Sequence, residues 1–281
     1  MVSVIITTKE ESDNISNCLE SVIQQNYPKE KMEIIVVDNS SLDRTIEIAK
    51  RYTDKVYTFG PNRSAQLNFG ANIAKGKYVL LPDADMILSK GVIEECVDKC
   101  EGEGFIALYI PERIIGRGFL GKIRDFERSF YNMTCIDAVR FIKKDKFSEI
   151  GGFEESITGP EDWDFDRRIK EMGKVNIIDT PLYHNEGRFN LREYLKKKRN
   201  YSKKFNNYIK KWGRNDPLIR KQFGLFYRYF GVFIEQGKWK KLLRHPLLFI
   251  QVFLLKILVG IVFLMSKLKK TQAAQGSIII K

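Results

Sequence analysis

Two acidic residues separated by one position follow a short apolar segment: Asp83 and Asp85 come directly after the residues VLLP. Carboxylates placed in this way can reach a single hard cation, and Mg²⁺ in proteins is commonly held by one or two carboxylates together with substrate phosphates. A plain turn or a helix N-cap is the alternative, because Asp is common in both. Thr7, Thr8 and Asp38 end two other apolar segments in the same manner, and their presence favours a metal and phosphate site.

A second acidic pair, Glu161 and Asp162, follows Gly159 and Pro160. A Gly-Pro turn that opens a helix leaves the carboxylates of the first turn exposed, and the helix dipole keeps them ionised. Ionised carboxylates exposed in this way are candidates for a second half of the site. Simple capping of the helix is the other interpretation, since both residue types favour a helix N-terminus.

The first 100 residues alternate strand and helix signals, and this alternation predicts a doubly wound α/β sheet. The expected strands cover residues 2–8, 33–38, 56–59 and 77–82. Ligands of open α/β sheets bind beyond the carboxyl ends of the strands, where the acids described above are placed. Neither a GxGxxG after the first strand nor a GxxxxGK[ST] occurs, which argues against a classical dinucleotide site or a P-loop. Further strands are expected over 105–110, 135–142 and 175–179, separated by a long excursion over 114–131 that contains glycines and charged residues.

Four segments resemble those of family 2 glycosyltransferases of the GT-A fold, in the order and spacing of that family. They are VSVIITTKEESDNISNCLESV, EIIVVDNSSLDRT, NFGANIAKGKYVLLPDADM and EIGGFEESITGPEDWDFDRRIKEMG, and together they cover roughly residues 2–185. The chain departs from the family twice. Its first strand is followed by Thr-Lys-Glu instead of Thr-Tyr-Asn, and Gln66-Leu67-Asn68 stands where Ala-Arg-Asn is usual. Arg63, four residues before Leu67, is a candidate to replace the missing arginine.

The resemblance implies a Rossmann-like mixed sheet flanked by helices and a metal-dependent transferase whose donor is a UDP- or GDP-sugar. It assigns the nucleotide-sugar contacts to Thr8, Glu11, Asp38, Arg63 and Asp83. Asp83 and Asp85 are then the carboxylates that hold the donor diphosphate through Mg²⁺ or Mn²⁺. A divalent cation at this position neutralises the charge that develops on the departing nucleoside diphosphate.

The acceptor side of the implied site lies later in the chain. The resemblance makes Asp162 the general base, with Glu161 positioning the donor or the acceptor. It also makes His184, which follows an expected strand in IIDTPLYHNEG, a candidate for a late metal ligand. A purely structural role for His184 is the alternative.

The charge of the chain is strongly divided. Residues 1–185 carry 25 basic and 31 acidic side chains, whereas residues 186–281 carry 23 basic and 4 acidic ones, a net charge of +19. Such asymmetry points the last third of the chain toward a polyanion, either nucleic acid or an anionic membrane surface. Aromatic residues interleaved with the lysines could stack bases, but no RNA-binding signature is present.

An apolar segment over 247–265 favours the membrane over nucleic acid as the partner, because only Gln251, Lys256 and Gly260 interrupt it. Its 19 residues are about the number needed to span a bilayer. The charge of Lys256 at its centre is costly for a simple span, and basic residues flank both ends, so no positive-inside direction results. We therefore expect a helix lying in the interface rather than a single span. A soluble core or dimer helix is the remaining alternative.

These observations predict a GT-A catalytic domain followed by a basic, partly hydrophobic helical extension. The expected parts are a GT-A domain over 1–185, a basic aromatic helical region over 186–246, a membrane-interacting helix over 247–266 and a basic tail over 267–281. Four cysteines without paired metal spacing, and a first strand with no signal peptide before it, indicate a reducing, intracellular compartment.

The predicted function is inverting transfer of a sugar from a nucleotide-diphosphate sugar to a polyprenyl-diphosphate-linked saccharide, at the cytoplasmic face of the cell membrane. A transferase that glycosylates polyprenyl phosphate itself is the first alternative. A non-catalytic scaffold that binds nucleotide sugars or membranes is the second.

Overall fold

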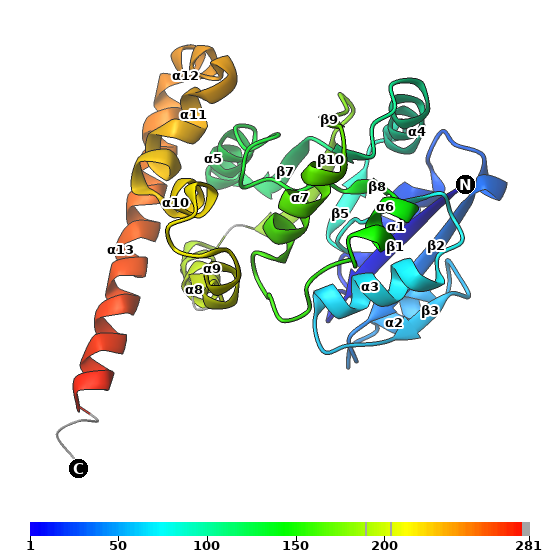
Figure 1. Ribbon diagram of the computed structural model, residues 1–281, viewed down its shortest axis with the longest axis horizontal. Coiled ribbons are helices and arrows are strands. Elements are labelled where there is room, and N and C mark those ends of the chain that lie inside the picture. Colours follow the sequence, from blue (N-terminus) through cyan, green and yellow to red (C-terminus); the bar gives the residue numbers. More distant parts are fainter. Residues whose placement is uncertain (189, 203, 277–281) are drawn as a thin grey trace.

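A seven-stranded mixed sheet forms the centre of the N-terminal half in the computed structural model, which describes residues 1–188, 190–202 and 204–276 (Figure 1). The strand order is β3-β2-β1-β4-β8-β6-β9. The strands are β1 (Val2–Thr8), β2 (Met32–Asp38), β3 (Val56–Thr58), β4 (Tyr78–Leu80), β6 (Ala107–Tyr109), β8 (Phe141–Lys143) and β9 (Val175–Ile177). β1 runs parallel to β2 and β4, whereas β8 is antiparallel to both of its neighbours. This architecture agrees with the α/β class expected from the sequence.

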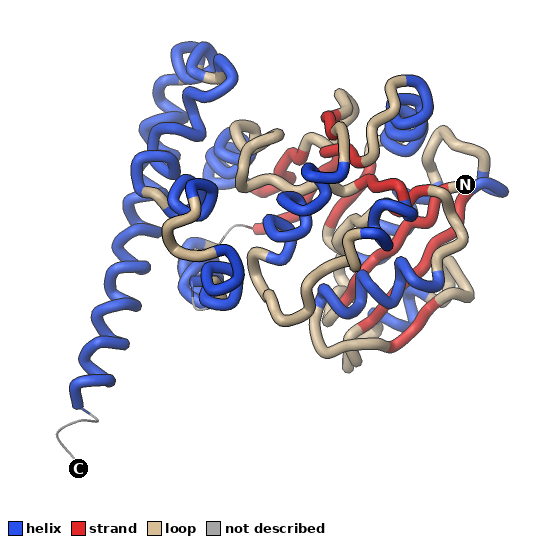
Figure 2. The backbone as a smooth tube through the Cα atoms, viewed as in Figure 1, coloured by secondary structure: helices blue, strands red, loops and turns tan. Residues whose placement is uncertain are grey.

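Helices cover both faces of this sheet (Figure 2). The face bearing Val4 and Ile6 packs against α1 (Ile15–Ile23), α2 (Thr45–Ala49) and α4 (Val92–Gly102). The face bearing Ile5 packs against α3 (Arg63–Ile73), α6 (Lys144–Glu149) and α7 (Glu161–Met172). Because neighbouring strand residues point to opposite faces, the unbroken apolar run of β1 is buried on both sides.

A smaller sheet lies beside the first one and has β10 (Leu182–Arg188) at its centre, between β5 (Met86–Leu88) and β7 (Glu112–Arg117). β10 pairs antiparallel with β5 and parallel with β7. It also crosses residue 185, where we expected the catalytic domain to end. This sheet places His184 opposite Met86, directly after the two acids of the DxD motif.

The segment over 114–131, expected as a long excursion, is instead β7 continued by the helix α5 (Gly118–Arg128). The glycines that suggested a loop have a packing role, since Gly116 and Gly121 approach one another so closely that a Cβ at either would meet the other's backbone. The expected strand over 135–142 is also shorter, because only its end belongs to β8.

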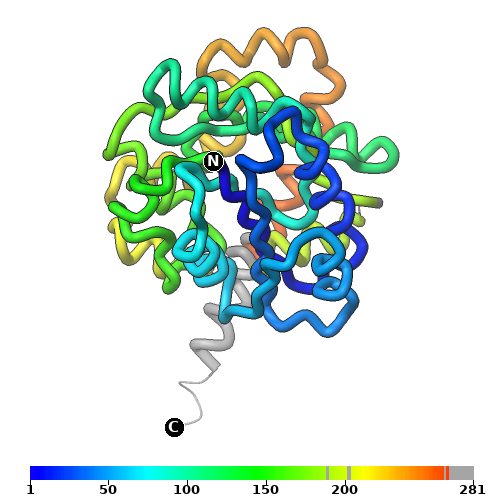
Figure 3. The backbone as a smooth tube through the Cα atoms, turned by 90° about the vertical axis from the view of Figure 1, so that its right-hand side faces the viewer, coloured from blue at the N-terminus to red at the C-terminus, as the bar shows by residue number. Residues whose placement is uncertain are grey.

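The C-terminal third is helical, and Figure 3 shows its orange segments behind the blue and cyan N-terminal half. Its helices are α8 (Leu191–Ser202), α9 (Asn206–Trp212), α10 (Pro217–Phe223), α11 (Val232–Ile234), α12 (Trp239–Arg244) and α13 (Pro246–Gly276). A π-helical turn, η2 (Tyr227–Gly231), joins α10 to α11, and short 3₁₀ turns occur as η1 (Lys29–Lys31) and η3 (Glu235–Gly237). α10 begins with Pro217 and is capped by the side chain of Asp216, which accepts hydrogen bonds from two backbone amides of the first turn.

The long helix α13 continues past residue 266 to Gly276 and packs one side against α5 and α11. Val252 and Leu255 are buried there among Ile123, Phe126 and Phe233. Among the described residues, no helix combines the length and the apolar character that crossing a membrane requires.

Candidate active site

The ends of β1 and β2 meet at one edge of the main sheet. Thr8 ends β1 and donates a hydrogen bond from Oγ1 to Oδ2 of Asp38, the fully buried last residue of β2, at 2.7 Å. The backbone amide and hydroxyl of Ser41 also donate to the Asp38 carboxylate. Gln66 closes this corner, because its Nε2 donates to the carbonyls of Thr8 and Val37. Thr8 and Asp38 therefore lie together, as the sequence predicts.

Glu11 lies in the loop after β1, where its backbone amide donates to Oγ1 of Thr45 and its carboxylate accepts from Asn14. Burial raises the pKa of Glu11, and the charges of Asp85 and Asp83 raise it further against the hydrogen bond from Asn14. Glu11 thus shares one electrostatic environment with the DxD motif.

Arg63 joins the two acidic motifs. It opens α3 and donates from Nε to Oδ1 of Asp83 at 2.7 Å and from Nη1 to Oδ1 of Asp162 at 2.8 Å. The same Nη1 lies 3.7 Å from Oε1 of Glu161. Gly159 turns the chain into α7 with a φ of 100°, a conformation that glycine adopts without strain, and so brings the Glu-Asp pair to this place.

A second arginine, Arg140, reaches the same acid from the other side and was not predicted from the sequence. Its Nη1 lies 3.4 Å from Oδ2 of Asp83, and its Nη2 lies 3.3 Å from Oε2 of Glu112. Burial works against the charged form of Asp83, but Arg63 and Arg140 outweigh it and hold the pKa of Asp83 below its ordinary value. The signal available was an arginine within the apolar segment before β8, where a charge needs a buried partner.

His184 lies between two carboxylates, since its Nε2 donates to Oδ2 of Asp85 at 2.9 Å and its Nδ1 to Oε1 of Glu112 at 3.0 Å. Burial opposes a charge on the ring, but these two hydrogen bonds prevail and raise the pKa of His184 to about 10. Burial likewise opposes the charge of Glu112, whose pKa is nevertheless held well below its usual range by Arg128 and His184. Glu112 was also missed by the sequence analysis.

The predicted metal ligands are not arranged as one three-ligand cluster, and no such group of His, Cys, Asp or Glu occurs among the described residues. The reason is that Asp83 faces two arginines and both nitrogens of His184 face carboxylates. Asp85 does fit a divalent cation, because its Oδ1 is buried and has no hydrogen-bond partner in the described structure. A carboxylate oxygen suits Mg²⁺ or Mn²⁺, and a bound diphosphate would add further oxygen ligands.

Glu161 lies beside Asp162 at the start of α7, and its Oε2 is likewise buried without a partner in the described part of the chain. Burial and the neighbouring charge of Asp162 raise the pKa of Glu161. Asp162 offers one oxygen to Arg63, while its Oδ2 has no hydrogen-bond partner among the described residues. The site thus combines two carboxylate oxygens without a protein partner in the described structure: one on Asp85 that could bind a divalent cation, and one on Asp162.

Comparison with known proteins gives a family match over more than half of the chain, as residues 3–154 match the model of glycosyl transferase family 2. A poly(ribitol-phosphate) beta-glucosyltransferase of Bacillus spizizenii is 34% identical over 128 residues, 42% of this chain and 20% of that protein. Glycosyltransferase AglE of Haloferax volcanii is 27% identical over 191 residues, 61% of this chain and 62% of that protein. The chain therefore covers less than two thirds of either relative.

A third relative, from Methanococcus voltae, is 24% identical over 229 residues, 70% of each chain. It is named a dolichyl N-acetyl-alpha-D-glucosaminyl phosphate 3-beta-D-2,3-diacetamido-2,3-dideoxy-beta-D-glucuronosyltransferase.

Solved structures share the fold. A mannosyltransferase from Pyrobaculum calidifontis, in complex with GDP-Man and Mn²⁺, superposes with a TM-score of 0.60 at 18% identity, over 99% of this chain and 79% of that one. S. aureus TarS in complex with UDP gives a TM-score of 0.56 at 16% identity, over 97% of this chain and 91% of that one. The mixed sheet flanked by helices is thereby confirmed as GT-A-like.

Proposed function

The chain belongs to glycosyl transferase family 2, and from this premise we propose that it transfers a sugar, with inversion, from a nucleotide-diphosphate sugar to a lipid-linked saccharide. The observation that carries this proposal is the bridge made by Arg63, which joins Asp83 of the DxD motif to Asp162 of the Glu-Asp pair. Asp162, which lies 99 positions after Arg63 in the chain, thus meets Asp83 at one guanidinium group. The proposed donor side, at Asp83, and the proposed acceptor side, at Asp162, are therefore connected through the side chain of Arg63.

The donor is proposed to be a UDP- or GDP-sugar, as in the complexes of TarS with UDP and of the Pyrobaculum calidifontis enzyme with GDP-Man. Asp85 would hold Mg²⁺ or Mn²⁺ through its unpartnered Oδ1. The cation supplies a Lewis acid that neutralises charge on the leaving diphosphate when it is bound. Thr8, Glu11 and Asp38 lie along the strand ends where the nucleoside would bind.

On the acceptor side, Asp162 is proposed as the general base. Arg63 fixes the carboxylate through Oδ1, and Oδ2 is left to take the proton of the acceptor hydroxyl. The hydroxyl oxygen then forms a bond to the anomeric carbon as the bond from that carbon to the diphosphate oxygen breaks. One displacement of this kind inverts the configuration. General-base catalysis of this type contributes about 10²–10⁴-fold to the rate.

We further propose that α13 associates with the cytoplasmic face of the cell membrane. One stripe of this helix, at spacings of three, four and seven residues, is exposed and apolar: Leu247, Ile250, Leu254, Ile257, Leu258, Ile261, Leu264 and Met265. The preceding helix α12 exposes Trp239 and Leu243 next to Lys240 and Arg244. Basic side chains near a bilayer surface gain about 1 kcal/mol each from anionic lipids.

Lys256, which interrupts the apolar segment, does not face this stripe. Its Nζ lies 3.3 Å from Oε1 of Glu127 and 3.1 Å from the hydroxyl of Tyr131 on the protein side. The objection that a central lysine raises against membrane contact is thereby removed, because the charge is paired inside the protein. This arrangement supports a helix that lies in the membrane interface.

The acceptor is proposed to be a saccharide on a polyprenyl phosphate or diphosphate. The name of the Methanococcus voltae relative describes an acceptor of this kind, a sugar joined to dolichyl phosphate. A sugar hydroxyl requires a base, which Asp162 offers, whereas the oxygen of polyprenyl phosphate is already ionised. The geometry of the Asp162 carboxylate therefore favours a saccharide acceptor over the bare lipid phosphate.

The test is nucleoside diphosphate release from a panel of UDP- and GDP-sugars, with lipid extract and with Mn²⁺, Mg²⁺ or EDTA. Wild type is compared with Asp85→Ala and with Asp98→Ala, a matched removal of an exposed acid on α4. We expect metal-dependent release from one donor, abolished by Asp85→Ala and retained in Asp98→Ala. If folded wild-type protein releases no nucleotide from any donor, the proposed transferase function is wrong.

A further inference from the structure

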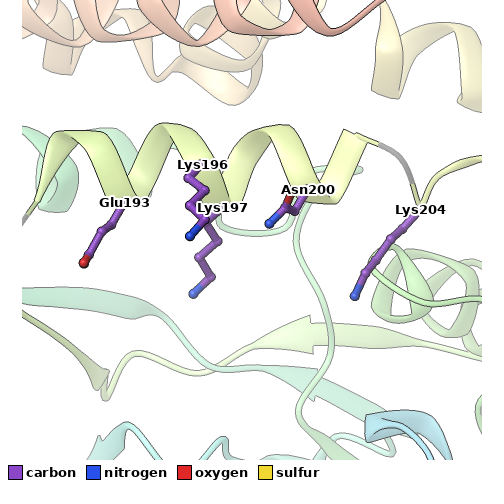
Figure 4. Close-up of a pocket in the computed structure, with 5 residues that line it drawn as sticks. All are labelled: Glu193, Lys196, Lys197, Asn200 and Lys204. Atoms are coloured by element: carbon purple, nitrogen blue, oxygen red, sulfur yellow. The ribbon is translucent and has the colours of Figure 1, made fainter. Parts of the chain in front are cut away.

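The helix α8 presents a row of basic side chains to a cavity of about 420 Å³. The lining residues are Glu193, Lys196, Lys197, Asn200 and Lys204. Figure 4 shows these side chains extending from α8, and from the segment that follows it, away from α13 and toward the strands. We call Lys196, Lys197 and Lys204 the lysine face.

The lysine face acts on the candidate active site. The positive charge of Lys197 lowers the pKa of Glu11, against the larger raising effect of burial, and Asp83 and Asp85 act on the same carboxylate in the opposite direction. Lys197 is therefore close enough to Glu11 for its charge to act on that carboxylate. The cavity lies on the side of α8 that faces the strands (Figure 4).

The opposite side of α8 is occupied by packing. Tyr194 lies under the guanidinium of Arg124, 4.8 Å from its ring centre, and Lys198 lies 5.1 Å from the same ring. Arg124 is itself paired with Glu186 of β10 at 2.9 Å. These contacts fix the rotation of α8 about its axis, so the lysine face is held toward the cavity.

The lysine face lacks acidic partners. Among the described residues, none of its three ammonium groups has a carboxylate within ion-pair distance, and Glu193 is the only acid among the lining residues. Ammonium groups with a shared open space in front of them form a site for a multiply charged anion, and lysine binds phosphate as a compact point charge.

Two phosphate groups take part in the proposed reaction, one on the donor and one on the acceptor. In the proposed function the donor diphosphate is bound through the cation at Asp85. None of the groups described so far is assigned to the acceptor phosphate, because Arg63 and Arg140 are paired with carboxylates of the site. Resting on the proposed function, we propose that the lysine face of α8 binds the phosphate or diphosphate of the lipid-linked acceptor.

The proposal fits the layout of the molecule. α8 lies between the catalytic sheets and α13 (Figure 1), and a phosphate bound to its lysine face would lie on the side of α8 that faces the sheets (Figure 4). In such an acceptor the phosphate lies between the sugar and the lipid chain. In the protein, α8 likewise lies between the catalytic sheets and α13 (Figure 1).

The experiment measures two affinities of the full chain by isothermal titration calorimetry, one for farnesyl diphosphate and one for UDP or GDP with Mn²⁺. The test variant is Lys196→Ala/Lys197→Ala. The matched control is Lys29→Ala/Lys31→Ala, which removes the same charge from exposed positions in η1. We expect the test variant to bind farnesyl diphosphate about tenfold more weakly while its nucleotide affinity is unchanged, and the control to match wild type.

Three results would overturn the proposal: wild type that binds no farnesyl diphosphate, a loss confined to nucleotide affinity, or equal losses in test variant and control. The first result excludes a diphosphate site. The second means that the lysines bind the donor nucleotide instead of the acceptor phosphate. The third means that the weaker binding comes from the lower net charge of the protein and not from this site. Because both readouts are binding affinities, they stay informative if wild type shows no transfer. In that case the proposed function is wrong, and the binding data still test the phosphate site independently.

Discussion

Two of the ion-pair networks among the described residues differ in how far water and ligands can reach them. The first, which we call the rim network, joins Arg63 to Asp83 and Asp162, with side chains 24–31% exposed. The second, the anchor network, joins Glu127 to Arg124 and Lys256, with side chains 5–11% exposed. The chemistry of the pairs is the same, but the side chains of the first are about a quarter exposed, whereas those of the second are almost fully buried.

The difference indicates two uses of one interaction. An oxygen of Asp162 in the rim network, and an oxygen of the neighbouring Asp85, have no protein partner in the described structure, so ligands can be added without displacing a strong contact. In the anchor network the Glu127 carboxylate accepts from Tyr131 and faces both Arg124 and Lys256. That closed arrangement holds α13 on α5 and leaves no position for a ligand.

The most severe way to break the rim network is Asp162→Asn, which keeps the shape of the side chain and removes the base. We expect kcat to fall by about 10²–10⁴-fold, because the acceptor hydroxyl loses its proton acceptor. Steady-state transfer assays check this, with the free energy of unfolding measured alongside. Asp179→Asn, at a side chain 98% exposed and distant from the rim, should keep full activity. A mild loss in Asp162→Asn would instead indicate that polyprenyl phosphate is the acceptor.

The anchor network is broken by Glu127→Gln, which leaves Arg124 and Lys256 buried without their shared acid. We expect the free energy of unfolding to fall by about 3 kcal/mol, the cost typical of removing one partner of a buried pair. Urea denaturation measures it, and Glu171→Gln at an exposed position of α7 serves as the control. Adding Lys256→Met to a Glu127→Leu variant should restore part of the loss. Unchanged stability in Glu127→Gln would mean that the network does not hold α13.

The outer side of α13 can be separated from its anchored side by Leu254→Ser/Ile261→Ser. These side chains are 56% and 47% exposed, so stability should change little. Affinity for vesicles containing anionic lipid should fall by about tenfold or more, because two apolar side chains no longer enter the interface. Vesicle co-sedimentation measures this. Leu42→Ser, which alters a leucine 95% exposed in the catalytic domain, should bind vesicles like wild type.

The smallest effect concerns Lys198, beside the anchor network. Burial, together with the charge of Arg124, lowers the pKa of Lys198 to about 7. Between this value and the ordinary lysine pKa, the unfolded chain carries a proton that the folded chain lacks, so stability rises with pH across that window. In Lys198→Met this rise should be smaller between about pH 7 and about pH 10. Urea denaturation at both pH values decides, and an identical rise in both proteins would contradict the lowered pKa.

The sequence was sufficient for the parts of the fold whose signals are local. The apolar runs ending in Thr8 and Asp38 form β1 and β2, and the parallel pairing of these strands puts the two side chains in hydrogen-bond contact. The four family segments predicted the mixed sheet correctly. The roles assigned to Glu161, Asp162 and the other site residues stay predictions, although the structure brings most of them together.

What the sequence could not predict depends on pairings between distant residues. Glu112 and Arg140 were missed because a buried charge is recognised only through its partner, and their partners lie on other elements. Lys256 was predicted to make a simple span costly, but its ion pair with Glu127, 129 positions earlier, was not predictable from the composition of its helix. The glycines within 114–131 suggested a loop, because the sequence carries no local signal that Gly116 and Gly121 pack closely against each other.

The rigid seating of α13 on α5 has a consequence for which acceptors can react. With the proposed membrane contact, α13 would set the height of Asp162 above the lipid surface, and the proposed phosphate site on the lysine face would set where the lipid phosphate lies. The separation between these two points would then select the length of the glycan. A saccharide one unit too short would leave its hydroxyl below the base, and one unit too long would carry it past. We would therefore expect the addition of a single sugar at a single stage of a growing chain, without contacts to each of the earlier sugars.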